Sequence, residues 1–212
     1  MKIILLIAAA VVSYLVSGIN PAIVLSTLIY KKDIRNEGSK NPGFTNFKRV
    51  FGSKYAWWVF FLDLFKAAII CMIFGMLFES IGMGRLLGVA YSGMFALLGH
   101  AFPCWYGFNG GKGFLVALST AFFLDFRAGL LAALIMVVLL LTVQFMSLAT
   151  LAGLTAGAVL LLFLSAVHPE TYPLIASVIY AACVLFVICR HRANIVRLLK
   201  GTESKTIMFH HK

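Results

Sequence analysis

Long apolar segments separated by short polar loops run through this 212-residue chain, and they limit its possible folds more than any other feature. Charged residues make up only 12% of the chain, whereas a typical soluble domain has about 25%. So few charges cannot coat a water-facing surface of this size, and most of the surface must therefore face lipid. Because the loops are too short for a separate soluble domain, we expect residues 1–212 to form a single polytopic membrane domain.

Seven apolar segments are predicted to form membrane helices in an all-α integral membrane protein. A helix needs about 20 residues to cross the hydrocarbon layer, and all segments but one are near that length. The exception, Phe114–Phe126, is short and polar at its end, so we expect a thin, shielded or re-entrant helix. In the first segment, Pro21 removes a backbone donor and predicts a kink. The segments are Ile3–Tyr30, Tyr55–Phe78, Leu86–Trp105, Phe114–Phe126, Ala128–Phe145, Leu148–Val167 and Tyr172–Cys189.

The distribution of basic residues predicts how the helices are oriented. Of the 18 basic residues, seven lie between Lys31 and Lys54 and six follow Cys189. The positive-inside rule places both regions in the cytoplasm, and the six crossings between them are consistent with that assignment. The N-terminus is then outside and the C-terminus cytoplasmic. Because the basic residues lie between apolar spans, we expect them to meet lipid headgroups or phosphorylated substrates, and we expect no nucleic-acid binding.

The first polar loop, Asp33 to Arg49, combines glycines, small polar side chains and cations. Gly38 and Gly43 allow close approach of the main chain, while Arg49 is among the cations that can share phosphate oxygens with backbone N–H groups. This mixture is typical of a phosphate site. The alternative is a solvated loop whose positive charge only sets topology.

The second polar loop, Tyr106 to Gly113, is rich in glycine and leads into an apolar helix. A glycine-rich turn before a helix N-terminus presents free amides and a favourable dipole to an anion, and Lys112 adds a point charge. The loop is not a P-loop, because Gly113 follows Lys112 where that motif needs Ser or Thr. The alternative is a flexible connector with one lysine that sets topology.

Further polar residues lie after the last apolar segment and inside the second one. His191 and Asn194 are three residues apart and share a face if the last helix continues; the alternative is a basic helix that lies on anionic lipid. Asp63 and Lys66 are also three apart, within a predicted span. We expect either a mutual ion pair that supports the nearby loop or a direct contact with substrate. His100, near the end of the third segment, is more typical of a packing residue than of a ligand.

Together, these elements resemble the bacterial acyl-phosphate:glycerol-3-phosphate acyltransferases, an integral membrane enzyme family. The resemblance covers essentially the whole chain, in order and with matching spacing. Lys40, Phe44 and Ala193 depart from it, where the family usually has Gly, Ala and Glu. The matching residues are Asp33 to Arg35, Gly38 to Asn46 and Arg49; Gly99 to Pro103 and Gly110 to Gly113; His191 to Ile195 with Gly201 to Glu203; Asp63 and Lys66; and Ser147 to Ala149.

The resemblance implies transfer of a fatty acyl group from acyl phosphate to the 1-hydroxyl of glycerol 3-phosphate, at the cytoplasmic face of the bacterial inner membrane. The products are lysophosphatidic acid and phosphate, as a step in phospholipid synthesis. No cofactor or metal is implied, and the enzyme that forms the acyl phosphate is a candidate partner. The implied catalytic residues are Ser39, Arg49, Lys112, His191 and Asn194, and the implied substrate- or phosphate-binding residues are Asn41, Gly43, Thr45, Asn46, Gly110, Gly111, Gly113 and Ser147.

A transporter of phosphorylated metabolites is the alternative function for a basic seven-span protein. A transporter would carry polar residues at mid-depth in its spans and inverted repeats. In this chain few polar residues enter the spans, and the polar motifs are predicted to gather at one face. That arrangement favours an enzyme that acts at the membrane surface.

Overall fold

The computed structural model describes residues 1–206, which form helices joined by loops and contain no strand. Lys212, one of the basic residues of the tail, lies outside the described residues. The helices are α1 (Lys2–Gly18), α2 (Pro21–Tyr30), α3 (Phe44–Phe51), α4 (Ser53–Ser80), α5 (Arg85–Ala101), α6 (Phe114–Leu124), α7 (Phe126–Thr142), α8 (Met146–Val167), α9 (Leu174–Arg190) and α10 (Arg192–Leu199), with 3-10 turns at Ile34–Asn36 and Cys104–Tyr106.

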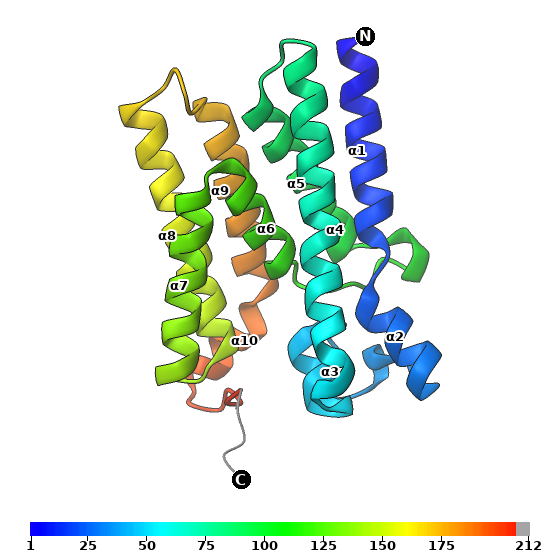
Figure 1. The fold of residues 1–212 in the computed structure, drawn as a ribbon. Coiled ribbons are helices and arrows are strands. Elements are labelled where there is room, and N and C mark those ends of the chain that lie inside the picture. Colours follow the sequence, from blue (N-terminus) through cyan, green and yellow to red (C-terminus); the bar gives the residue numbers. More distant parts are fainter. Residues whose placement is uncertain (207–212) are drawn as a thin grey trace.

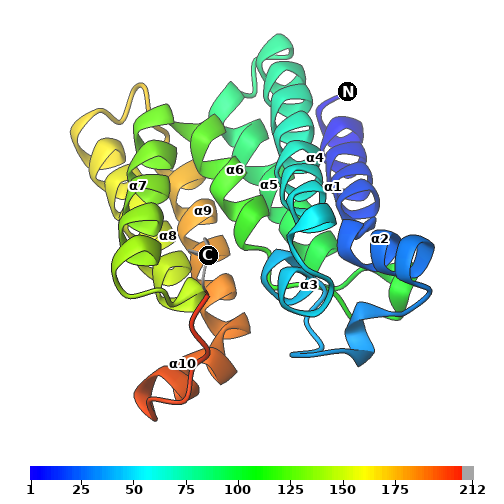
Figure 2. The same cartoon turned by 60° about the horizontal axis from the view of Figure 1, so that its bottom comes forward.

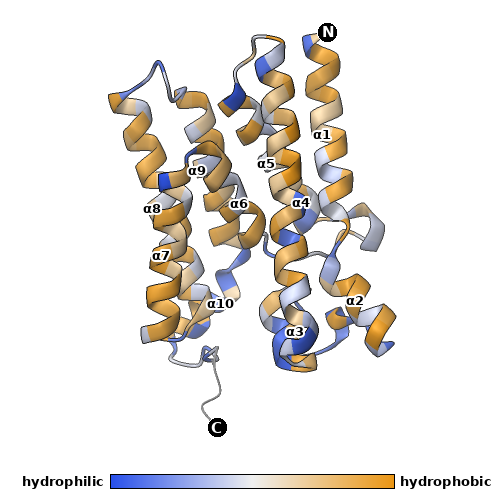
Figure 3. Ribbon diagram, in the orientation of Figure 1, coloured by the Kyte–Doolittle hydropathy of each residue, from blue (hydrophilic) through white to orange (hydrophobic). Residues whose placement is uncertain are grey.

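The long helices run side by side in a bundle, with α6 between two groups (Figure 1). α6 packs against α4 and α5 on one side and against α7, α8 and α9 on the other. Large apolar side chains remain exposed along the outer faces of α1, α4 and α7, as the hydropathy colouring illustrates (Figure 3). An apolar outer surface of this kind fits a lipid environment, because apolar patches of such extent are rare on soluble monomers.

Four described segments are long and apolar enough to cross a membrane, namely Lys2–Tyr30, Ser53–Ser80, Arg85–Tyr106 and Met146–Val167. A fifth is present if α9 and α10, which are bent by 59°, count as one span. α6 and α7 are shorter apolar helices. The all-helical membrane architecture is as predicted, whereas the seven crossings and their orientation stay predictions. Each of the seven predicted segments is helical in the structure. α1 begins at the end of the bundle opposite to α10 (Figure 1).

The kink predicted at Pro21 is in the structure a break between α1 and α2. The Asn20 side chain caps α2, accepting hydrogen bonds from the backbone N–H groups of Ala22 and Ile23 at 3.0 and 3.1 Å, and Pro21 occupies the first helical position, where its missing donor costs little. The Asn20 side-chain amide also donates to the Pro42 carbonyl at 3.1 Å. The break therefore anchors the loop that leads into α3.

α6 starts partway along the length of α4 (Figure 1). Asp63, ten residues into α4 and thus roughly 15 Å from its start at 1.5 Å per residue, lies 3.4 Å from His100 at the end of α5. The loop after α5 folds back on that same end before α6 begins. Consequently the polar loops reach well into the bundle, and this depth accounts for the short apolar segment at Phe114–Phe126.

Candidate active site

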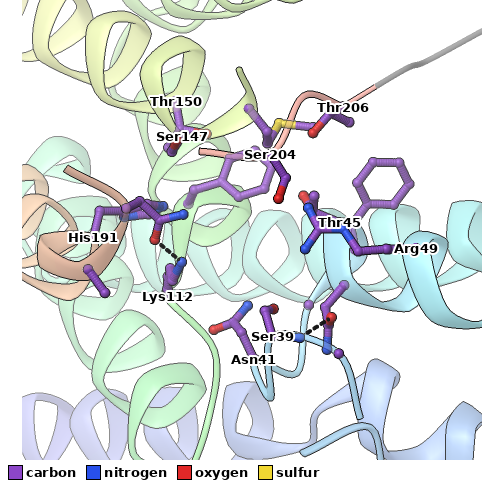
Figure 4. Close-up of a pocket in the computed structure, with 18 of the residues that line it drawn as sticks. Ser39, Asn41, Thr45, Arg49, Lys112, Ser147, Thr150, His191, Ser204 and Thr206 are labelled. Carbon is purple, nitrogen blue, oxygen red and sulfur yellow. Dashed lines mark hydrogen bonds between the residues drawn. The ribbon is translucent and has the colours of Figure 1, made fainter. Parts of the chain in front are cut away.

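A cavity of about 430 Å³ lies where the three polar elements meet. Ser39, Asn41, Thr45 and Arg49 lie on one side of it, and Lys112, Ser147 and His191 on the other (Figure 4). All predicted site residues line the cavity except Gly110 and Gly111. The full lining is Gly38, Ser39, Asn41, Gly43, Phe44, Thr45, Asn46, Arg49, Asp63, His100, Lys112, Gly113, Phe114, Leu115, Met146, Ser147, Thr150, His191, Ala193, Asn194, Arg197, Glu203, Ser204 and Thr206.

Asn46 holds the first loop in shape from within α3. Its side-chain oxygen accepts the Ser39 N–H at 2.8 Å, and its amide donates to the Glu37 carbonyl at 3.0 Å. Gly38 between them has φ +55°, and a side chain there would collide with Asn46. Phe44 and Phe47 pack this loop onto a small apolar core shared with α2 and α4. Asn46 therefore positions Ser39 at the cavity wall.

Arg35 joins the first loop to the second. Its guanidinium donates to the Tyr106 carbonyl at 2.7 Å and is held by the Asp33 carboxylate, with a shortest distance of 2.6 Å. Hydrogen bonds from Arg35 lower the pKa of Asp33 below its usual value, although burial opposes that shift. The pair fixes the distance between the two loops that form opposite sides of the cavity.

Gly110 and Gly111 differ from their predicted role as phosphate donors. The Gly110 N–H bonds the Ala101 carbonyl at 3.2 Å, and the Gly111 N–H bonds the His100 carbonyl at 3.1 Å. A side chain on Gly111 would collide with the His100 imidazole. Their amides are thus already occupied by backbone carbonyls, and in this structure the two glycines pack the loop tightly against α5 and aim the residues that follow.

Three helix N-termini converge on the cavity. Gly43 precedes α3, Gly113 precedes α6 and Phe145 precedes α8, and none of the three helices has a side-chain cap. First-turn residues of each helix line the cavity. An uncapped N-terminus presents backbone N–H groups and the positive end of the helix dipole. The arrangement therefore attracts anions independently of the side chains.

Lys112 is the central cation of a hydrogen-bonded group that we call the Lys112 network, formed with Asn194, Glu203, Ser147 and Arg197. Lys112 donates to the Asn194 side-chain oxygen. The Asn194 amide donates to Glu203 at 2.7 Å, and Ser147 and Arg197 donate to the same carboxylate at 2.8 and 2.6 Å. Since an amide has one oxygen and one NH₂ end, the bond to Glu203 turns the Asn194 oxygen toward Lys112.

Charge and burial shift the pKa values within this network. Burial, together with the positive charges of Arg197, Arg190 and Arg49, lowers the pKa of Lys112 to about 8, while Glu203 opposes the shift. Burial acts to raise the pKa of Glu203, but the hydrogen bonds that Asn194, Ser147 and Arg197 donate to its carboxylate outweigh burial. The pKa of Glu203 is therefore lowered. At neutral pH the cavity therefore keeps a positive excess, which suits a phosphate.

His191 lies at the junction of α9 and α10. Its Nδ1 is 2.8 Å from the Val187 carbonyl, an acceptor, so this nitrogen carries the proton and Nε2 is left as an acceptor. Burial lowers the pKa of His191 to about 4, and the charge of Lys112 adds to the shift. The imidazole is therefore neutral at physiological pH.

Asp63, Lys66 and His100 form a second polar group, the Asp63 cluster. Lys66 lies 2.8 Å from Asp63, and its ammonium also donates to the Ser17 and Ile19 carbonyls at 2.7 and 3.0 Å. The predicted ion pair is present, and it supports the break between α1 and α2. Asp63 and His100 line the cavity, while Lys66 contacts the backbone carbonyls.

Glu203 and Arg197 are the main site residues to which sequence reasoning gave no role. Glu203 belongs to the matched Gly201-Thr-Glu203 motif, but nothing in the sequence indicates that the segment after α10 returns to Ser147. That return is fixed by the Thr206 N–H, which bonds the Gln144 carbonyl at 2.7 Å. Across residues 1–206, no group of three or more His, Cys, Asp or Glu side chains is arranged to hold a metal ion.

An apolar helical bundle with a cation-rich, amide-lined cavity defines a helical integral membrane protein with a polar site suited to anions. A family model described as glycerol-3-phosphate acyltransferase matches residues 7–201. The chain therefore belongs to the glycerol-3-phosphate acyltransferase family of membrane enzymes.

Curated relatives and solved structures agree over nearly the whole chain. The glycerol-3-phosphate acyltransferase of Thermoanaerobacter pseudethanolicus is 36% identical over 94% of this chain and 94% of its own, and that of Finegoldia magna is 32% identical over 97% and 98%. The crystal structure of PlsY, an integral membrane glycerol 3-phosphate acyltransferase, in its glycerol 3-phosphate form matches with TM-score 0.83 and 31% identity, over 95% of this chain and 96% of that one. Its lysophosphatidic acid form matches with TM-score 0.79 and 30% identity, over 95% of each chain.

Proposed function

We propose that this protein transfers a fatty acyl group from acyl phosphate to the 1-hydroxyl of glycerol 3-phosphate. The hydroxyl oxygen bonds to the acyl carbon, the bond from that carbon to the phosphate oxygen breaks, and the products are lysophosphatidic acid and inorganic phosphate. Family membership supports the acceptor and the transfer. The observation that carries the proposal is the convergence of three uncapped helix N-termini with Lys112 and Arg49 on one cavity, since both substrates bring phosphate.

The cations and amides divide the work of binding in this proposal. Arg49 and Lys112 neutralise the phosphates, and the amides after Gly43 and Gly113 donate to their oxygens. Ser39, Asn41 and Thr45 hydrogen-bond the ligand from the first loop. Ser147 and Asn194 complete the pocket from the other side. Acyl phosphate is already activated, so positioning and charge stabilisation supply most of the rate.

We assign the hydroxyl proton to a substrate phosphate rather than to His191. A pKa near 4 makes the His191 imidazole a weak base, whereas a phosphate monoester has a second pKa of about 6 and lies among the reacting groups. His191 Nε2 then accepts a hydrogen bond from the other hydroxyl of glycerol 3-phosphate and so aligns the attacking one. This role uses the tautomer fixed by the Val187 carbonyl.

In the membrane, we propose seven crossings with the N-terminus outside and the site at the cytoplasmic face of the bacterial inner membrane. Thirteen of the 18 basic residues lie between Lys31 and Lys54 or after Cys189. The positive-inside rule places both regions in the cytoplasm. The short α6 completes a crossing because its start is already deep in the bundle (Figure 1). The enzyme that forms the acyl phosphate remains a candidate partner on this face.

The test is a transfer assay with purified protein, glycerol 3-phosphate and either palmitoyl phosphate or palmitoyl-CoA. We expect lysophosphatidic acid from palmitoyl phosphate alone. Product from the CoA donor would change the proposed donor, and no product from palmitoyl phosphate would overturn the proposal. Glu170→Gln is the matched control for charge variants, because Glu170 lies in an exposed turn between α8 and α9, away from the cavity.

A further inference from the structure

α10 has two faces of different character. The inner face carries Asn194, which is buried and bonded to Lys112 and Glu203. The outer face carries two apolar side chains, Val196 and Leu199, which are 48% and 84% exposed. Two exposed apolar side chains do not by themselves require a partner, so their meaning depends on the residues that border them.

Two cations border the exposed apolar pair. Arg192 and Lys200 are both exposed, and each lies four residues from Val196. Residues at i, i+4 and i+7 or i+8 share one face of a helix, so Arg192, Val196, Leu199 and Lys200 form one continuous surface, which we call the α10 outer face. A strip of apolar residues bordered by cations is the composition of helices that lie at a membrane surface.

The direction of α10 also favours the membrane surface. α9 ends at Arg190 and α10 turns away from it by 59°, so the helix runs obliquely to the span it follows. Viewed with this end of the bundle brought forward, α10 lies at the margin of the molecule rather than over its centre (Figure 2). In the proposed topology, this margin is where lipid headgroups surround the bundle.

We infer that the α10 outer face binds the headgroup layer of anionic phospholipids and thereby holds Asn194 in the active site. The cations meet the lipid phosphates, and Val196 and Leu199 enter the adjoining acyl boundary. Because Asn194 and Arg197 project from the inner face of the same two-turn helix, fixing the outer face fixes the Lys112 network. The effect on activity rests on the proposed function, whereas the lipid contact does not.

The first experiment measures transfer in nanodiscs of phosphatidylcholine, with and without added phosphatidylglycerol. We expect phosphatidylglycerol to raise activity by about fivefold to tenfold, as two cations at an anionic surface allow. Arg192→Gln/Lys200→Gln is expected to remove that increase while keeping the activity seen in phosphatidylcholine. The matched control is Lys2→Gln/Arg85→Gln, which removes two exposed cations from the other end of the bundle and should keep the increase. An unaltered increase in the α10 variant would overturn the inference.

A second experiment reads the lipid contact without any catalysis. The exposed thiols are replaced by Cys104→Ser and Cys189→Ser, leaving the buried Cys71 and Cys183, and a nitroxide is attached through Leu199→Cys. In vesicles containing phosphatidylglycerol, the label should be relaxed by oxygen more than by a water-soluble nickel complex. A label attached through Glu170→Cys, in the exposed turn, should show the reverse.

The outcomes of the two experiments separate the possible explanations. A water-accessible label at position 199 would overturn the lipid contact and point to a protein covering this face. A lipid-accessible label together with an unaltered phosphatidylglycerol effect in Arg192→Gln/Lys200→Gln would overturn the inference and leave only an apolar contact with lipid. Absence of any transfer activity would overturn the proposed function, while the label would still report on the lipid contact.

Discussion

The Asp63 cluster and the Lys112 network are two buried groups of charges that meet the same cavity and differ in what they leave unpaired. In the Asp63 cluster, one carboxylate faces one ammonium, and the remaining donors of Lys66 are taken by backbone carbonyls. In the Lys112 network, Glu203 faces Arg197 and Lys112, with Arg49 and three helix N-termini nearby. The first group is closed in the sense that its two opposite charges balance each other, whereas the second, open group keeps a positive excess directed into a cavity.

The contrast indicates how structure and binding separate within a membrane protein. Charges inside a bundle are costly and persist when they are paired or functional. The closed Asp63 cluster stabilises the backbone, because Lys66 holds the carbonyls at the break between α1 and α2. An open one is fully satisfied only when a ligand arrives. Variants of the two lysines test this difference most directly.

Lys66→Met should cost stability more than chemistry. It leaves Asp63, whose side chain is 3% exposed, as a buried charge with only the His100 imidazole beside it, at 3.4 Å. Removing one partner of a buried ion pair costs about 3–5 kcal/mol. We expect a lower midpoint of thermal unfolding in detergent, with the remaining folded protein still active. The double variant Asp63→Asn/Lys66→Met should recover part of the loss. Unchanged stability with abolished transfer would mean that Lys66 acts on substrate and that the cluster is not closed.

Lys112→Met should have the opposite profile. Removing a donor that stabilises charge in a transition state typically costs roughly 10²–10³-fold in rate, and the loss should be in kcat/KM for transfer from palmitoyl phosphate. The unfolding midpoint should stay near that of the parent, because Lys112 sits in a loop and burial already disfavours its charged form. A large fall in the unfolding midpoint with only a modest loss of activity would mean that Lys112, like Lys66, has a structural role.

The Asp63 cluster could be predicted from the sequence to a larger extent than the Lys112 network. The helical membrane fold and most of the cavity lining were predictable, because hydropathy and glycine-rich motifs are local signals. The pairing of Asp63 with Lys66 was also predictable, since helical spacing brings residues three apart together. The Lys112 network was not, because Glu203 reaches Ser147 only through the return of the chain after α10. The occupied amides of Gly110 and Gly111 also follow from tertiary packing alone.

Glu203→Ala tests whether the carboxylate acts through Asn194. Its loss frees the Asn194 amide to rotate, and we expect transfer to fall about 10- to 100-fold, as loss of an orienting hydrogen-bond partner typically does at metal sites. In the double variant with Asn194→Ala, the two losses should not add, because both changes remove one interaction. Additive losses in kcat/KM would instead assign Glu203 a separate role. The unfolding midpoint of each variant distinguishes either outcome from misfolding.

His191→Gln should have a smaller effect. If a substrate phosphate accepts the proton, the imidazole contributes one aligning hydrogen bond, whose loss is worth about 1 kcal/mol, or roughly fivefold in rate. The acid limb of the pH–rate profile should be unchanged. His191, with a pKa of about 4, is already neutral over the pH range in which a substrate phosphate with a pKa of about 6 titrates. Loss of the acid limb together with a collapse of kcat would identify His191 as the base.

The smallest expected effect is a displacement of the alkaline limb. Lys112 must be protonated to bind phosphate, and its pKa of about 8 predicts that kcat/KM, which reports the free enzyme, falls as pH rises through that value. Glu203 raises this pKa and Arg197 lowers it, so Glu203→Gln should move the limb to lower pH and Arg197→Gln to higher pH. Glu170→Gln, in the exposed turn at the other end of the bundle, should move it in neither direction. Shifts in the same direction in both variants would show that the alkaline limb reports the titration of a group other than Lys112. The positive excess of the Lys112 network would then not be centred on Lys112.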